Sequence, residues 1–233
     1  MTTVVREHLP FPAAELVRAW VTGWAPAREL PPPVEVAGGF RLHVGLPGHR
    51  VRYVLFDVDR VAELARTRTA PGTWIKVLAP AERVRQDLTP AWIVGEPEYP
   101  MTGPLRRATA SAPSGYTIEV ESTGEVILVR LRAADGDVAA YGRIAVTGET
   151  AVADRIGTEA AHRRRGLGSV VMTALGDAAA ARGARTGVLV ASSDGLALYS
   201  TLGWTRHGVL TPAWIPEPEP ESTSAPAQPR PAR

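Results

Sequence analysis

Residues 154–169 read DRIGTEAAHRRRGLGS and join the end of an expected β-strand to the start of an expected α-helix. The first backbone N–H groups of a helix have no partner inside it, and the helix dipole adds about half a positive charge there. A pyrophosphate group can therefore be bound largely by main chain at this turn. Gly166 and Gly168 leave room for the anion, and Ser169 adds a hydroxyl donor. Charge-assisted contacts come from Arg163, Arg164 and Arg165.

The segments around this turn predict a compact α/β unit. Alternating apolar and polar residues predict strands at 116–121, 125–132, 138–146 and 151–158, close enough in sequence to be antiparallel neighbours. A helix is expected over 165–182 with Gly183 as its C-terminal cap, followed by an apolar strand at 186–191. A second helix at 194–202 and a last strand at 204–209 complete the unit.

Two motifs in this unit resemble those of the GNAT (N-acetyltransferase) family. Arg163-x-x-Gly166-x-Gly168 resembles the family's pyrophosphate signature, in the same strand-to-helix setting. Leu198-Tyr199, three further residues and then Gly203-Trp204 are similar to a second family segment. The resemblance implies the α/β (α+β) acyl-CoA N-acyltransferase fold: a mixed, mostly antiparallel sheet flanked by helices, with acetyl-CoA as co-substrate.

The resemblance also implies a place for each part of the cofactor. Pantetheine is expected in a gap between the strands at 151–158 and 186–191, with backbone groups of Ile156 and Thr158 facing its amides and thioester. A backbone N–H there would polarise the thioester carbonyl. The expected cofactor-binding residues are Ile156, Thr158, Arg163, Arg164, Arg165, Gly166, Leu167, Gly168, Ser169 and Ser192.

Direct acetyl transfer needs a neutral amine and a proton donor for the departing thiolate. Tyr199 falls where family members place a general acid; the alternative is a core tyrosine on a helix face. The general base is less defined. Asp154 shares a face with Ile156 and Thr158 if the strand alternates regularly, and it could act through a water, pair with Arg155 or only cap the structure. Glu119 and Glu121 are further candidates if their strand faces the same cleft.

Stretches rich in proline and glycine divide the chain into four predicted parts. These are an N-terminal α/β region at 1–95, a linker at 96–114, the acetyltransferase domain at 115–215, and a disordered, proline-rich tail at 216–233. In the first part, strands are expected at 40–46, 51–57 and 74–78, and helices at 58–68 and 81–88. It has no Arg-x-x-Gly-x-Gly turn, so it is not expected to bind CoA. The hexapeptide Leu-Thr-Pro-Ala-Trp-Ile occurs at both 88–93 and 210–215, through duplication of a β-α unit or through chance.

Many relatives roof the acceptor site with two helices after the first strand, and this chain runs directly into its next strand instead. The first 95 residues are expected to supply the roof, as a partner domain or as a degenerate second copy of the fold. A cleft between the two halves is the expected acceptor site, lined by some of Trp20, Trp24, Trp74 and Trp92.

Composition limits the remaining function classes. The net charge of +2 argues against nucleic-acid and membrane partners, and the absence of cysteine excludes disulfides, thiolate metal sites and a cysteine nucleophile. No metal-ligand spacing occurs among the histidines. The absence of a signal-like or membrane-spanning apolar run favours the cytoplasm. A homodimer is compatible with the sequence.

Together these features predict an acetyl-CoA-dependent N-acetyltransferase that transfers acetyl directly to a primary amine of a small molecule. The alternative is a non-catalytic module that binds acyl-CoA as a sensor or scaffold. The residues do not identify the acceptor.

Overall fold

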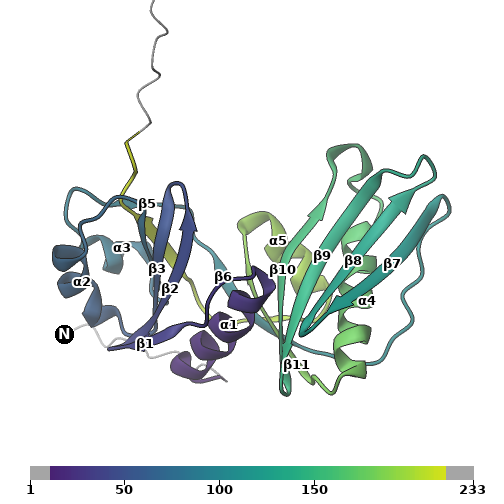
Figure 1. Ribbon diagram of the computed structural model, residues 1–233, viewed down its shortest axis with the longest axis horizontal. Helices are drawn as coiled ribbons and strands as arrows, with labels where there is room; N and C mark the ends of the chain where they lie inside the picture. The colour runs from purple at the N-terminus through teal and green to yellow at the C-terminus, as the bar shows by residue number, and fades with distance from the viewer. Residues whose placement is uncertain (1–10, 219–233) are drawn as a thin grey trace, which may run out of the picture.

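The computed structural model describes residues 11–218 and contains two mixed β-sheets lying side by side (Figure 1). The first sheet has the order β1-β2-β3-β4-β13-β5 and the second β12-β6-β11-β10-β9-β8-β7. The strands of the first are Val34–Val36 (β1), Gly39–Leu46 (β2), His49–Leu55 (β3), Thr73–Val77 (β4), Thr211–Trp214 (β13) and Ile93–Val94 (β5). Those of the second are Thr205–Arg206 (β12), Tyr99–Pro104 (β6), Thr186–Ala191 (β11), Thr150–Thr158 (β10), Val138–Thr147 (β9), Val126–Ala133 (β8) and Tyr116–Thr123 (β7).

The helices cover both faces of each sheet. Helix α1 (Ala13–Ala27) lies between the two sheets, and α4 (Leu167–Ala181) covers the opposite face of the second sheet (Figure 1). On the outer face of the first sheet lie α2 (Val61–Thr67) and α3 (Ala81–Arg85), with a 3₁₀ turn at Val58–Arg60 before α2. Helix α5 (Ser193–Thr201) follows β11, and a second 3₁₀ turn spans Ala160–His162. The mixed α/β class predicted from sequence is confirmed. The strands predicted at 116–121, 125–132, 138–146, 151–158 and 186–191 occur close to their expected bounds, whereas the strand expected at 204–209 is only Thr205–Arg206.

Helix α1 is the structural link between the two sheets, and the sequence analysis did not predict it. Leu16, Val17, Trp20, Val21 and Trp24 recur at helical spacing and enter a core shared with Phe40 and Leu42 of β2 and with Val152 of β10. At its C-terminal end, Arg143 of β9 donates from Nη1 to the Ala27 carbonyl oxygen at 2.6 Å. The helix therefore joins the two halves of the chain, and its role as the roof of an acceptor site remains a prediction.

The two sheets exchange strands. In the first, β3 and β4 are parallel and joined through α2; β13, from the end of the chain, lies beside β4, with β5 beyond it. In the second, β10 and β11 are parallel and joined through α4; β6, from the first half, lies beside β11, with β12 beyond it. Each half therefore sends one strand into the other sheet.

This exchange corrects the expected linker and domain ends. Tyr99–Pro104, inside the expected linker, is a strand paired along its length with β11. Its prolines, Pro100 and Pro104, obscured it in the sequence, but they fall outside the two residues that pair with β12. Similarly β13, within the expected second domain, completes the first sheet.

The repeated hexapeptides occupy different structural positions. Residues 88–93 lead from the end of α3 into β5, and Trp92 is buried against α2. Residues 210–215 contain β13, the exchanged strand, so the two copies do not mark corresponding points of a repeat. The similarity between the halves lies in the order of strands and helices instead.

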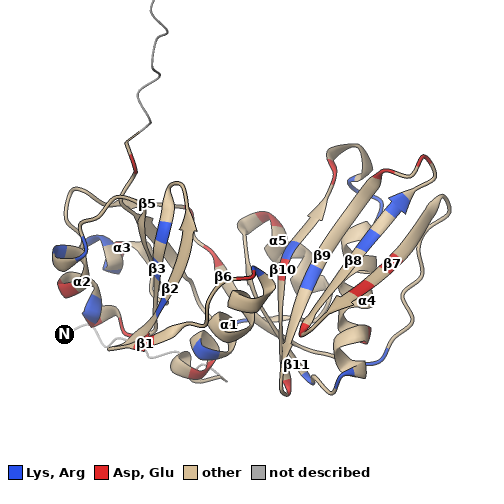
Figure 2. Cartoon of the chain, viewed as in Figure 1, with Lys and Arg blue, Asp and Glu red and all other residues tan. Residues whose placement is uncertain are grey.

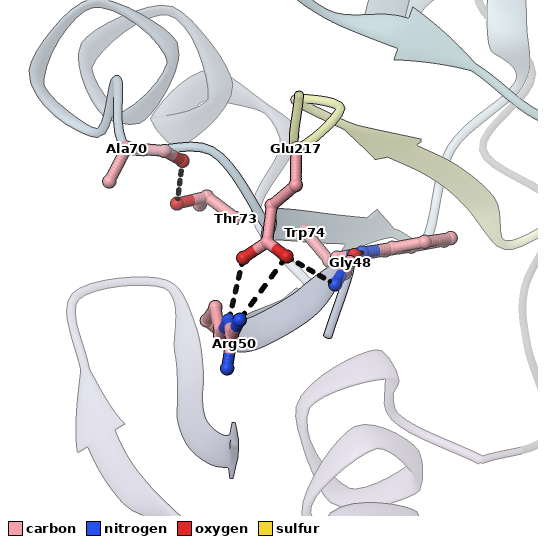
Figure 3. A network of polar contacts seen from close by, with 6 residues as sticks. All are labelled: Gly48, Arg50, Ala70, Thr73, Trp74 and Glu217. Atoms are coloured by element: carbon pink, nitrogen blue, oxygen red, sulfur yellow. Dashed lines mark hydrogen bonds and ion pairs between the residues drawn. The ribbon is translucent and has the colours of Figure 1, made fainter. Parts of the chain in front are cut away.

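Part of the expected tail is ordered against the first sheet. Glu217 accepts hydrogen bonds from the Gly48 backbone N–H at 2.6 Å and from Arg50 Nε at 2.6 Å (Figure 3). Trp74 Nε1 donates to the Gly48 carbonyl oxygen at 2.7 Å, so strand β4 and the segment after β13 both clamp the β2–β3 turn. The prediction of disorder fails for residues 216–218, and 219–233 lie outside the described residues.

Glycine at position 23 permits the close approach of α1 to the second sheet. A Cβ atom built there would lie 2.7 Å from Cβ of Val152, a rigid side chain in the middle of β10. Gly176, in α4, is a control position, because a Cβ atom there would fit: its nearest neighbour, Leu105 Cδ2, would lie 3.8 Å away.

We expect Gly23→Ala to lower the free energy of unfolding by about 1–3 kcal/mol, because the clash outweighs the gain in helix propensity. Gly176→Ala should instead leave it unchanged or raise it by up to about 1 kcal/mol. Denaturant titration of both variants measures the difference, and adding Val152→Ala should restore part of the loss in the first. Equal shifts in the two single variants would contradict the proposed close packing.

Candidate active site

The parallel pairing of β10 with β11 stops early and opens the second sheet. The two strands pair only from Thr150 opposite Thr186 to Val152 opposite Val188. Beyond this point β10 pairs with β9 alone, through a bulge between Asp154 and Gly157. Arg155, at the bulge, has a φ of 52°, in the left-handed region. The gap lies between the two strands expected to separate.

The bulge changes which face each side chain of β10 occupies. Val152 and Asp154 point to the α1 side, where they meet Gly23 and Arg28. The Ile156 side chain points to the α4 side, because its Cδ1 lies with Val171 and Leu175 around Gly142. The expectation that Asp154 shares a face with Ile156 is therefore wrong, since the extra residue of the bulge shifts the alternation by one.

A cavity of about 1120 Å³ occupies the opened sheet and continues into the space between the two halves. All expected cofactor-binding residues except Arg165 line it, as do Tyr199 and Asp154. Arg165 points elsewhere: its Nη1 donates to the Tyr116 hydroxyl at 2.7 Å. Tyr116 also lies 3.0 Å from His162 Nδ1, so Arg165 and His162 both meet strand β7.

The N-terminus of α4 forms one end of the cavity. Gly166 is its N-cap residue with a φ of 76°, and no side chain caps the helix. Arg164, in the preceding turn, also has a positive φ of 63°. The N–H groups of the first turn of this 15-residue helix therefore face the cavity beside Arg163 and Arg164.

In the first sheet, by contrast, the corresponding parallel strands remain closed. β3 and β4 pair without interruption from Val51 opposite Thr73 to Leu55 opposite Val77. The helix that joins them, α2, has only seven residues. Only the second sheet therefore opens between its parallel strands.

Tyr199, on α5, lines the cavity and is mostly buried. Burial and, to a lesser extent, the nearby charge of Asp154 raise the pKa of Tyr199 to about 12. The phenol therefore stays protonated throughout the neutral range and can donate a hydrogen bond into the cavity. Ser192 caps the same helix by accepting from the Gly195 N–H at 3.2 Å.

The carboxylates proposed as bases lie in two different settings. Asp154 accepts from Arg28 Nε at 2.7 Å and from Arg28 Nη2 at 3.0 Å, and not from Arg155. Glu119 and Glu121 pair with Arg132 and Arg130 on the outer strands β7 and β8 and do not line the cavity. Only Asp154, already bound to an arginine, is positioned near Tyr199.

The first half lines the far end of the cavity with aromatic residues that the sequence analysis expected there and with charged residues that it did not assign to a site. Trp20, Trp24 and Arg28 come from α1 and the residue after it, Arg52 from β3, Trp74 and Lys76 from β4, and Glu98 from the segment before β6. Arg52 and Lys76 are only 6% exposed although charged. A cation in the middle of an apolar strand is the sequence signal that could have identified them. Trp92 lies in a different core.

Burial and the positive charges at this end of the cavity together lower the pKa of His49. Burial, followed by the charges of Arg52, Lys76 and Arg28, lowers the pKa of His49 from 6.5 to about 3. His49 is therefore neutral and accepts a hydrogen bond at Nε2 from Arg52 Nε at 3.1 Å. Lys76, paired with Glu98, has its pKa lowered to about 8, first by burial and then by Arg52.

Charges of both signs occur in both halves of the molecule (Figure 2). Within residues 11–218 no group of three or more potential metal-ligating side chains comes together. No helix of this part of the chain is long and apolar enough to cross a membrane.

Comparison with known proteins identifies the GNAT acetyltransferase fold that the sequence motifs indicated. The family model described as the acetyltransferase (GNAT) family matches residues 81–204, more than half of the chain and across the expected linker. A GCN5-related N-acetyltransferase from Kribbella flavida aligns with a TM-score of 0.64 at 15% identity, covering 88% of this chain and 97% of its own. A putative GNAT-family acetyltransferase from Novosphingobium aromaticivorans gives 0.57 at 18% identity, covering 89% and 99%.

A third structure, a GCN5-related N-acetyltransferase from Sphaerobacter thermophilus, aligns with a TM-score of 0.54 at 12% identity, covering 90% of this chain and 95% of its own. The search of curated proteins finds no match. Because these solved structures extend over both sheets, the two-sheet arrangement is shared with them and is not particular to this chain.

The neutral state of His49 predicts a pH-dependent stability. In the unfolded chain His49 binds a proton below its ordinary pKa of 6.5, whereas the folded protein does not until about pH 3. Stability from this group is therefore complete above pH 6.5 and is lost as the pH falls. His49→Gln keeps an acceptor for Arg52 and removes the proton uptake.

Between about pH 6 and pH 5, the free energy of unfolding should fall more steeply in the wild type than in His49→Gln, by up to about 1.4 kcal/mol per pH unit. Urea titrations across this range measure the two slopes. Parallel curves would show that His49 titrates equally in the folded and unfolded states.

Proposed function

We propose that this chain, which belongs to the GNAT acetyltransferase family, transfers an acetyl group from acetyl-CoA directly to a primary amine of a small molecule. The observation that carries the proposal is the single cavity that joins the N-terminus of α4, the opened strands and the polar end supplied by the first half. A cofactor entering from one end and an amine from the other would meet beside Tyr199.

The cofactor is assigned to the half of the cavity made by the second sheet. Its pyrophosphate would receive hydrogen bonds from the first-turn N–H groups around Leu167 and Gly168 and from the Ser169 hydroxyl, with Arg163 and Arg164 balancing its charge. Pantetheine would run along the edge of β10 that no longer pairs with β11, near Ile156 and Thr158. When bound, the cofactor supplies the activated acetyl group as a thioester.

The transfer forms the C–N bond and breaks the C–S bond, and the proton released by the amine ends on the sulfur. Tyr199 is proposed to donate a hydrogen bond to the departing sulfur. The pKa of Tyr199, about 12, lies above the value near 8.5 of an ordinary thiol. Full transfer of the tyrosine proton to the sulfur, before the amine has released its own proton, is therefore unfavourable. Tyr199 thus stabilises and relays rather than supplying a net proton.

Asp154 is proposed to orient the incoming amine and to accept its proton transiently through a water, before that proton passes to the departing sulfur. Both of its oxygens already accept from Arg28, which fixes the carboxylate at the junction of the two halves. The ion pair also links α1 to β10, so the same contact that orients the carboxylate holds the roof in place.

A non-catalytic acyl-CoA-binding module is the second candidate. It is favoured by the fact that both carboxylates at the acceptor end are ion-paired, Asp154 with Arg28 and Glu98 with Lys76. This candidate requires tight CoA binding, no acetyl transfer to any amine, and no effect of Tyr199→Phe.

Gly166→Trp should weaken CoA binding by roughly ten-fold or more, because a side chain there would stand over the first-turn N–H groups. Gly183→Trp is the matched control: Gly183 follows the other end of α4, also has a positive φ, of 92°, and also faces open space. Both variants carry the same kind of backbone strain, but only the first blocks the cavity. Calorimetric titration with CoA separates them, and equal affinities would refute the assigned pyrophosphate site.

Tyr199→Phe should lower kcat by about 100-fold or more while leaving the affinity for acetyl-CoA within about two-fold, since the hydroxyl acts on the departing sulfur. Thiol release followed over pH measures it. In the wild type no alkaline loss from Tyr199 is expected until the pH approaches its pKa of about 12. Undiminished turnover in Tyr199→Phe, with acetylated product formed, would remove Tyr199 from the mechanism.

A further inference from the structure

Arg52 is a buried cation in the cavity without a carboxylate partner among residues 11–218. It lies on β3 with its side chain on the cavity face, opposite Trp74 in the register with β4. Only 6% of the residue is exposed. Most of this charged side chain is removed from water, which is unfavourable unless another charge or several hydrogen bonds compensate it.

One side of the Arg52 guanidinium is fixed by the protein. Its Nε donates to the neutral His49 at 3.1 Å, and its carbon lies 4.3 Å from the centre of the Trp24 ring. His49 is in turn held 4.8 Å from the ring of Trp74, which stacks on Trp214 at 4.7 Å. Strand β13 and the β2–β3 turn thus hold the guanidinium plane in one orientation.

The other side of the guanidinium remains open. Neither Nη1 nor Nη2 makes a hydrogen bond to a described residue, and neither is sealed from solvent. The two nitrogens therefore form a planar pair of donors at the cavity wall. This geometry matches the two oxygens of a carboxylate.

The neighbouring cations are already matched with carboxylates. Arg28 pairs with Asp154, and Lys76 pairs with Glu98. His49 carries no charge, so the cluster of Arg28, Arg52, Lys76, Asp154 and Glu98 holds one positive charge more than its carboxylates balance. An anionic group on the ligand would remove this excess, whereas a second cation there would be repelled.

We infer that the amine acceptor also carries a carboxylate, which binds to Nη1 and Nη2 of Arg52. The inference rests on the proposed acetyl transfer and adds the substrate class: an amino acid or another amine with a carboxylate at a fixed distance. The amine would then point toward Asp154 and Tyr199, and the carboxylate toward the first sheet.

The test uses pairs of acceptors that differ in one group: ω-amino carboxylates of increasing chain length and the carboxamide of each. For the best chain length, kcat/KM should favour the carboxylate by roughly 30-fold or more. The ratio should fall to near one in Arg52→Met. Arg50→Met is the matched control, since Arg50 lies on the same strand but pairs with Glu217 outside the cavity, and its ratio should equal that of the wild type.

Binding of the same pairs to the CoA-saturated protein, measured by calorimetry, gives a readout that needs no turnover. Arg52-dependent carboxylate binding without any acetyl transfer would refute the proposed function and support the ligand class. Transfer to amines with a carboxylate-to-carboxamide ratio near one in the wild type would support the function and overturn the inference. The carboxylate-to-carboxamide ratio of the wild type tests the inference even if Arg52→Met fails to fold.

Amino phosphonates of the same chain length distinguish the anion. Preference for the phosphonate over the carboxylate, lost in Arg52→Met, would overturn the assignment to a carboxylate. Weaker binding of the phosphonate would support it, because the two open nitrogens form a planar fork with Nε already occupied.

Discussion

The early end of the pairing between β10 and β11 is the constraint on which the rest of the site depends. Two parallel strands in a buried sheet normally satisfy each other's backbone groups along their length. Here the ladder stops at Val152 and Val188, and the bulge at Arg155 turns β10 away. The unpaired backbone edge of β10 lies at the cavity, where we propose that pantetheine pairs with it. The helix N-terminus of α4 lies at the open end of the same gap.

Much of this arrangement could be predicted from local sequence, because the determinants are local. The glycines at 166 and 168 set the turn, and alternating apolar residues set the strands of the second half. The face of Asp154 was predicted wrongly because a single residue at a bulge reverses the alternation, and nothing in the sequence marks Arg155 as left-handed. The predicted roles of Tyr199 and of the cofactor-binding residues remain predictions.

The rest depends on contacts between residues far apart in sequence. Helix α1 could have been predicted from the spacing of Leu16, Trp20 and Trp24, but its position between two sheets could not. β6 was mistaken for a linker because Pro100 and Pro104 suggest irregular structure, and its pairing with β11 compensates for them. The cluster of Arg28, Arg52 and Lys76 forms only when three segments that are separate in sequence come together, so no sequence motif predicts it.

The exchange of β6 and β13 makes the two halves mechanically inseparable. A protease cut in the connection around residues 106–114 would leave each fragment still threaded through the other's sheet, held by backbone ladders on both sides of the exchanged strand. A gene split at that point would therefore yield two polypeptides whose sheets each lack one interior strand. Until the two polypeptides associate, the backbone groups on either side of the missing strand would be unpaired. Neither half is therefore expected to fold alone as a free-standing module, because each sheet needs an interior strand from the other half.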